Sequence, residues 1–281
     1  MNRRRSASLK ARLDGLLAGF DFAAHRASDP VELVHRFSDD GDREVAGLVA
    51  ALLAFGNVTT IRRSVGRVLD VLGPHPADAI GRMRHSTLNR RLDGFVHRVW
   101  RGEHVATLLH RAGRLRAREG SLGEAFALRL DQRDGDLREA LADLADELRG
   151  PAPDRSLAHL VPNPRAGSAC KRLLLYLRWM VRPADGVDLG LWTGVSPASL
   201  VIPVDTHILR IGANLGLTDG KTASWKTAME ITHALRALDP TDPVKYDFAL
   251  CHLGVSRQCP SRRDPELCAS CELRSQCKHW R

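Results

Sequence analysis

Four cysteines near the carboxyl end have the residue type and the spacing of a metal centre. They follow the pattern C-x8-C-x2-C-x5-C within the last 23 residues. A tetrad this compact lets one short loop surround a single centre, and four thiolates suit zinc and an iron–sulfur cluster equally. From residue types alone zinc is the default, because structural zinc sites are common. The predicted ligands are Cys259, Cys268, Cys271 and Cys277.

Positive charge is the second chemical signal. The chain has 42 Lys and Arg residues against 33 Asp and Glu residues, a formal charge of +9. Ten arginines and only two acids lie between Arg82 and Arg118, and no acid separates the basic residues between Arg165 and Arg182. A basic run is often only a solvated face. Two such runs with interleaved aromatic residues favour phosphate binding.

The elements that must position these residues are helices. Apolar residues recur at helical spacing over Val45 to Leu53 and over Leu137 to Leu148, and no alternating β-branched run competes with them. An all-α fold is therefore expected, with roughly ten to fourteen helices at typical lengths. Proline-containing breaks are predicted at 150–154, at 162–164 and at 183–186, because proline lacks the amide donor that a helix needs.

The amino terminus and the apolar content indicate where in the cell the protein resides. The basic amino terminus has no apolar stretch before Asp14, which argues against a secretory signal. No apolar run approaches the roughly 20 residues of a membrane-spanning helix. A cytoplasmic, nucleoid-associated monomer is expected, without a membrane partner. Its other two thiols, Cys170 and Cys251, are predicted to be ordinary buried groups rather than members of a disulfide framework.

Three motifs together carry a resemblance to a known family. They are the cysteine tail, the segment V-D-T-H at 204–207, and the segment G-S-A-C-K at 167–171. They resemble the helix-hairpin-helix (HhH-GPD) DNA glycosylase superfamily, whose endonuclease III-like members end in a four-cysteine iron–sulfur loop. The segments C-K-R-x4-L-R-W-M-V-R at 170–182 and D-P-V-K-Y-D-F-A-L at 242–250 are similar to those of an uncharacterised bacterial family within it.

The resemblance implies a two-lobed all-α fold that binds DNA between its lobes. It implies a helical barrel at 29–163, and a second domain formed by 1–28 together with 164–281. It also changes the expected metal centre, since the tail of that superfamily holds a 4Fe-4S cluster; zinc stays the alternative.

The catalytic residues implied by the resemblance are Asp205 and Lys171. Cleavage of an N-glycosidic bond builds positive charge on the sugar, which a nearby carboxylate stabilises. From the residues alone, an Asp before Thr-His-Ile-Leu is more often a helix N-cap. Lys171 corresponds to the lysine nucleophile of the bifunctional members, and burial is expected to lower its pKa. The alternative for Lys171 is a phosphate contact on a basic helix.

The resemblance also supplies DNA contacts and base-stacking residues. Predicted DNA-binding residues are Arg165, Gly167, Arg172, Arg178 and Asn57. Predicted stacking residues are Trp192 and Trp179, although aromatic residues at helical spacing more often belong to a core.

Several features depart from the superfamily pattern. The first cysteine interval is x8 where x6 is usual, and the hairpin keeps one glycine in place of G-x-G. Lys171 and Asp205 are 34 residues apart, so residues 185–200 are expected to loop out. That separation is similar to the archaeal 8-oxoguanine glycosylases of the same superfamily. The glutamine that usually inserts opposite the extruded base is absent near Asn57.

The sequence therefore predicts a base-excision-repair N-glycosylase with an associated lyase activity at abasic sites. Its expected substrate is double-stranded DNA containing a damaged base, in particular an oxidised one such as 8-oxoguanine. A second hypothesis is a non-catalytic binder of damaged or branched DNA that keeps the metal loop. A third is an enzyme acting on RNA, since no residue clearly reads the 2′-hydroxyl.

Overall fold

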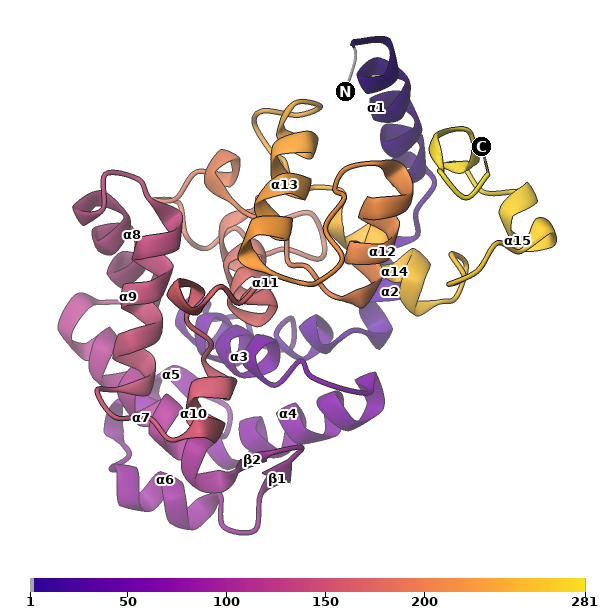
Figure 1. The fold of residues 1–281 in the computed structure, drawn as a ribbon. Helices are drawn as coiled ribbons and strands as arrows, with labels where there is room; N and C mark the ends of the chain where they lie inside the picture. Colours follow the sequence, from indigo (N-terminus) through magenta and orange to yellow (C-terminus); the bar gives the residue numbers. More distant parts are fainter. Residues whose placement is uncertain (1–2, 281) are drawn as a thin grey trace.

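The computed structural model describes residues 3–280, and this part of the chain is almost entirely helical (Figure 1). Its fifteen α-helices and one two-stranded hairpin confirm the predicted all-α class. The count exceeds the expected ten to fourteen because several helices have only five to seven residues. The first part holds α1 (Arg3–Ala18), α2 (Phe22–Ser28), α3 (Asp40–Leu52), α4 (Val58–Leu72), α5 (Pro76–Arg82), α6 (His85–Arg91), β1 (Val96–His97), β2 (Trp100–Arg101), α7 (Gly102–Glu119), α8 (Leu122–Gln132) and α9 (Leu137–Arg149).

After the proline-rich break that follows α9, the chain builds six more helices. These are α10 (Arg155–Leu160), α11 (Lys171–Val181), α12 (Thr206–Leu215), α13 (Trp225–Arg236), α14 (Asp247–Val255) and α15 (Pro265–Ala269). Short 3-10 turns lie at Pro30–Leu33, Pro164–Ala166, Pro197–Ser199 and Arg274–Gln276. The predicted breaks at 150–154, 162–164 and 183–186 are confirmed, because α9, α10 and α11 end just before them.

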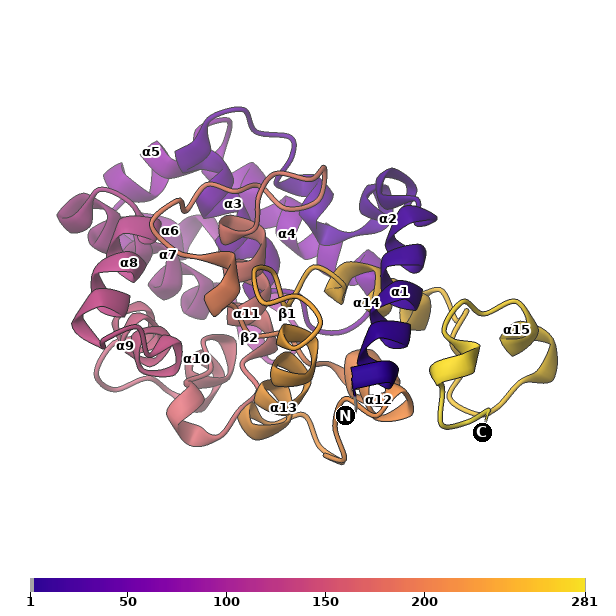
Figure 2. The same ribbon diagram turned by 90° about the horizontal axis from the view of Figure 1, so that it is seen from above.

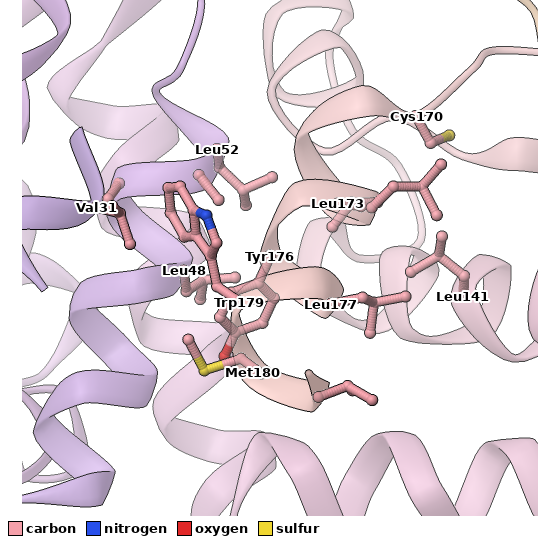
Figure 3. Packing of buried hydrophobic residues seen from close by; sticks show 14 of the residues in the cluster. Val31, Leu48, Leu52, Leu141, Cys170, Leu173, Tyr176, Leu177, Trp179 and Met180 are labelled. Atoms are coloured by element: carbon pink, nitrogen blue, oxygen red, sulfur yellow. The ribbon is translucent and has the colours of Figure 1, made fainter. Parts of the chain in front are cut away.

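Helix α11 crosses the centre of the molecule and packs along α3. The α3 stripe predicted from the sequence is buried, and Leu48 and Leu52 face Tyr176 and Trp179 of α11 (Figure 3). The two helices approach so closely at Gly47 that a methyl group there would lie 2.6 Å from Met180 Cε. This interface holds α11, which begins at Lys171, against α3.

The hairpin β1–β2 was not predicted. Val96 pairs with Arg101 and His97 with Trp100, leaving Arg98 and Val99 as the two-residue turn. Arg98 has a positive φ of 58°, which suits the tight hairpin turn. His97 is buried, where its ring nitrogens contact Ser64 Oγ and the carbonyl oxygen of Leu53, so the hairpin is anchored to the end of α3.

The segment between α11 and α12 does not loop out, contrary to expectation. Its backbone folds back along the end of α11, where the N–H of Leu189 bonds to Trp179 O and that of Trp192 to Met180 O. Val187 is also buried. The apolar residues of this segment pull it into the core, because leaving them in water would cost the free energy that their burial provides.

Ion pairs join the segments 170–182 and 242–250, which both contribute to the family resemblance. Arg178 contacts Asp247 at 2.6 Å, and Arg182 contacts Asp242 at 2.9 Å. Both arginines also pair with the buried Asp188. The basic residues at the end of α11 thus fix α14 and the preceding segment to this helix.

The amino-terminal helices lie against the last third of the described chain. Tyr246 Oη donates to Asp14 Oδ1 at 2.6 Å, and the rings of Phe22 and Phe248 stack at 6.0 Å. Residues 1–2 and 281 of the predicted second domain lie outside the described residues, and the predicted boundary near 163 stays a prediction. Figures 1 and 2 show α1 and the tail with α15 together, at the opposite end from α8 and α9. No helix within 3–280 is long and apolar enough to cross a membrane.

Candidate active site

The starts of two helices bring the predicted catalytic pair together. Lys171 is the first residue of α11, Asp205 immediately precedes α12, and Lys171 Nζ lies 3.1 Å from Asp205 Oδ2. The lysine side chain keeps 32% of its surface exposed and the aspartate 15%. The pair therefore lies at the edge of the core, where a ligand can reach it from solvent.

Local backbone structure explains both positions. Asp205 Oδ1 accepts hydrogen bonds from the N–H groups of His207 and Ile208, both at 2.8 Å, so Asp205 is the N-cap of α12. Cys170 has the left-handed conformation, φ 47° and ψ 34°, which turns the chain directly before Lys171. The N-cap expected from the residues alone and the carboxylate expected from the resemblance use different oxygens of one side chain.

The electrostatics of the pair correct one prediction. Burial alone would lower the pKa of Lys171, but Asp205 outweighs it and raises that pKa above the ordinary value. Conversely, burial favours the neutral form of Asp205, yet Lys171 and the helix N–H groups hold its pKa below the usual value. The expected lowering of the lysine pKa is wrong, because the nearest charge to Lys171 is a carboxylate.

Two side chains of α14, Cys251 and Asp247, lie behind the Lys171–Asp205 pair, and the sequence analysis did not predict them. Cys251 Sγ lies 3.5 Å from Asp205 Oδ2, so this predicted ordinary thiol is a contact of the site. Burial raises the pKa of Cys251 well above the usual value. Burial likewise raises the pKa of Asp247 to about 6, against the opposing effect of Arg178. The i, i+4 spacing of these residues was the available signal, since it places both on one face of α14.

An exposed turn between α3 and α4 lies near the start of α11. Phe55 is 39% exposed, and the guanidinium of Arg98 lies 5.2 Å from its ring centre. Asn57, also exposed, caps α4 by accepting from the N–H groups of Thr59 and Thr60. The turn offers an aromatic face and a cation to a ligand, and the exposure of Phe55 was not predicted.

The predicted DNA contact by Arg172 is wrong for this structure. Its side chain points inward from α11, donates to Leu52 O at 3.0 Å and to His159 O, and stacks 4.6 Å from the Trp100 ring. Burial lowers its pKa to about 10. Arg172 therefore ties the start of α11 to α3 and α10 instead of reaching a phosphate.

The predicted DNA contacts by Arg165 and Arg178 are wrong for a different reason. Both side chains already form ion pairs with carboxylates. Arg165 contacts three acids of α9, the nearest being Asp143 at 2.6 Å. Arg178 is only 2% exposed and pairs with Asp188 and Asp247. A phosphate would have to displace these carboxylates. Gly167 remains free of such neighbours: its φ is +78°, and no atom lies within 4 Å of the position of a Cβ.

The two predicted stacking residues are core residues. Trp179 is 1% exposed and lies in the α3–α11 interface (Figure 3). Trp192 is 4% exposed, donates from Nε1 to Glu44 Oε1, and packs edge-on to Tyr176. Its backbone is bonded to Met180, nine residues beyond Lys171 and so about 13 Å along the helix. Neither ring can stack on a base held at Lys171.

The four tail cysteines line one cavity together with Arg262, Arg274 and Trp280. All four are half-buried and none is in a disulfide. Among residues 3–280, no group of three or more His, Cys, Asp or Glu side chains is arranged to hold a metal ion. The donor set is nevertheless the one that iron–sulfur clusters and structural zinc use.

The tail is tied to the far end of α12. Arg210 Nη1 donates to Cys259 O at 2.7 Å, and the N–H of Lys278 donates to Asn214 O at 2.7 Å. Arg5, on the amino-terminal helix α1, donates to Leu215 O at 3.1 Å. One helix therefore carries Asp205 at its start and the cysteine loop near its end.

Comparison with known proteins gave one finding. A family described as a protein of unknown function (DUF2400) matches residues 29–256. Neither the curated proteins nor the solved structures contain a match to this chain.

Proposed function

This chain belongs to the DUF2400 family, and from the Lys171–Asp205 pair we propose that it is a DNA base-excision N-glycosylase. The carrying observation is that an ionised carboxylate and an ammonium group, 34 residues apart in the sequence, meet at two helix starts with access to solvent. Such a pair suits a reaction in which positive charge develops on a sugar. The proposed substrate is double-stranded DNA with a damaged, in particular oxidised, base.

Asp205 is the proposed electrostatic catalyst. Its low pKa keeps the carboxylate charged at neutral pH, and the two N–H bonds to Oδ1 fix its orientation. As the bond between C1′ and the base nitrogen breaks, its electron pair leaves with the base and C1′ becomes positive. A fixed negative charge beside C1′ stabilises that transition state more than the ground state.

Lys171 is the proposed nucleophile of the lyase step. The resting side chain is an ammonium, so substrate entry has to separate it from Asp205 and its proton has to move to the departing base. The neutral amine then forms a bond to C1′. The C1′–O4′ bond breaks as a proton moves from the nitrogen to O4′, which leaves a protonated Schiff base. Loss of a proton from C2′ then breaks the C3′–O3′ bond, and the 3′ phosphate leaves as the strand is cleaved. A monofunctional enzyme would instead direct a water molecule to C1′ and leave Lys171 charged.

The exposed turn at Phe55 and Asn57 is the proposed neighbour of the DNA. An aromatic ring stacks on any base, and Arg98 adds a cation beside it. Gly167 lets a phosphate approach the backbone before α11. These contacts replace those first predicted for Arg172, Arg178 and Trp192.

For the tail we propose the 4Fe-4S cluster, with zinc as the alternative. Cys259, Cys268, Cys271 and Cys277 would hold it, and its role would be to fix the loop against α12. We further propose the two-lobed helix-hairpin-helix arrangement, with the barrel at 29–163 and the hairpin at the turn before Lys171.

Protein purified under anaerobic conditions should be brown and contain about four irons per chain. Cys268→Ser should lose that iron, whereas Cys170→Ser, at a buried thiol outside the cavity, should keep it. A colourless anaerobic preparation that holds one zinc and no iron would overturn the cluster.

A borohydride trapping assay over a panel of lesion-containing duplexes tests the enzyme activity. We expect a covalent protein–DNA adduct with at least one oxidised base, and its loss in Lys171→Gln. Lys10→Gln is the matched control, because Lys10 also pairs with an aspartate, Asp14, but on α1. Base release without an adduct would identify a monofunctional enzyme.

The competing proposal is a non-catalytic binder of damaged or branched DNA. It is favoured by one observation: Lys171 and Asp205 already satisfy each other without a substrate. Specific binding to lesion-containing or branched DNA, with no base release from any substrate in the panel, would select it.

A further inference from the structure

A second basic region lies away from Lys171 and Asp205. Helices α6, α7 and α9 surround an open cavity of about 510 Å3. These helices lie at the opposite side of the molecule from α12 and α14 (Figures 1 and 2). The cavity is lined by His85, Thr107, His110, Arg111, Arg114, Leu115, Arg118 and Glu147.

Its charge is only partly compensated within the protein. Arg118 is paired with Glu119 and Glu147, and Arg129 contacts the same two acids, so these four groups balance. Among residues 3–280, neither Arg111 nor Arg114 has a carboxylate within 4.0 Å. Arg111 makes one bond, to the carbonyl oxygen of Glu147. Two guanidinium groups on one face of α7 therefore remain without an anion.

Two imidazoles complete the lining, with ring centres 5.7 Å apart. Thr107 Oγ1 donates its proton to Glu103 O, so it can only accept from Nε2 of His85. His110 bonds to the backbone of Met83. Burial, then His85, Arg114 and Arg111, lowers the pKa of His110 below its usual value. Burial and the neighbouring positive charges thus disfavour the protonated form of His110.

We infer that this cavity binds a phosphate group of a nucleotide or of a nucleic-acid backbone. Paired guanidinium groups bind phosphate through bidentate, charge-assisted bonds. The negative charge of either kind of phosphate would also favour the protonated imidazole of His110. The volume exceeds the need of a bare ion and lies in the range of small-molecule sites. This inference is independent of the glycosylase proposal, because no residue of the cavity belongs to that site.

The test uses the full chain labelled at the histidine rings and two probes, deoxyadenosine monophosphate and an undamaged DNA duplex. We expect at least one probe to cause saturable shifts of the His85 and His110 ring signals and to raise the pKa of His110. Arg114→Gln should lower the affinity for that probe about tenfold, which is the effect of losing one charge-assisted contact. Arg90→Gln is the matched control, since Arg90 is exposed on α6 but does not line the cavity.

The outcomes separate the two sources. If the monophosphate saturates the shifts, the ligand is a nucleotide. If only the duplex does, and Arg114→Gln also reduces the salt dependence of its binding by about one unit, the ligand is a backbone phosphate. The inference fails if neither probe moves the histidine signals, or if Arg114→Gln and Arg90→Gln weaken binding equally. None of these readouts requires base release, so they stand apart from the proposed enzyme activity.

Discussion

The two ends of α11 use the same chemistry for opposite purposes. At its start, Lys171 meets one carboxylate, Asp205, and a third of its side chain stays exposed. Toward its end, Arg178 and Arg182 meet several carboxylates in the core. The first pair can open for a ligand, whereas opening the second would leave charges buried without partners. The presence of a basic residue therefore does not identify a candidate site. What distinguishes the site from a structural ion pair is how deeply the basic residue is buried and how many carboxylates it meets.

Arg178→Met should have the largest effect. It leaves Asp188 and Asp247 buried without their cation, which typically costs about 3–5 kcal/mol. Urea unfolding would measure the loss in the free energy of unfolding. Arg178→Lys is the control, because it keeps the charge and should retain part of that stability. A loss below about 1 kcal/mol for Arg178→Met would show that this end of α11 is no more structural than the other.

Asp205→Asn should act on rate instead of stability. Asparagine is an equally good N-cap, so α12 should keep its start. The lost charge should slow base release about a hundred- to a thousandfold while DNA affinity stays near normal. Single-turnover base release on the best lesion measures this. Unchanged release would reduce Asp205 to a helix cap and leave the non-catalytic binder as the function.

The pH dependence of the free energy of unfolding should report on the buried ion pairs near the end of α11. The folded state keeps the proton of Asp247 up to about pH 6, while an unfolded aspartate loses it near 4. Between those values the folded state binds more protons, so stability should fall as pH rises, by roughly 2–3 kcal/mol. Urea unfolding at pH 4.5 and 6.5 should show this decrease, and Asp247→Asn should reduce it. An equal decrease in Asp247→Asn would assign it to another group.

Lys171→Met should change stability least. Its partner Asp205 keeps two backbone N–H bonds and some access to water, so about 1 kcal/mol or less is expected from the lost pair. The same urea unfolding gives the comparison with Arg178→Met. A loss as large as that of Arg178→Met would make the Lys171 pair structural too.

Much of this contrast could not be read from the sequence. The apolar stripes of α3 and α9, and the N-cap at Asp205, follow from local spacing, and the structure confirms them. That Lys171 meets Asp205 was expected only from the resemblance, since no local rule links residues 34 apart. Arg172 was misplaced because helical spacing does not tell which side of α11 faces α3. Trp192 was misplaced because the segment that carries it packs along the end of α11 instead of looping out. Arg165 was misread because the acids that neutralise it lie on α9.

Helix α12 has a consequence for how the protein is made. Its last carbonyl groups receive hydrogen bonds from Arg5 and from the backbone of Lys278, so segments far apart in the chain complete one helix. A ribosome synthesises Asn214 well before Lys278. On a nascent chain the carboxylate at the start of α12 therefore exists before the helix behind it can be finished. The carboxyl end of α12 is completed only after the cysteine loop has been synthesised and has docked.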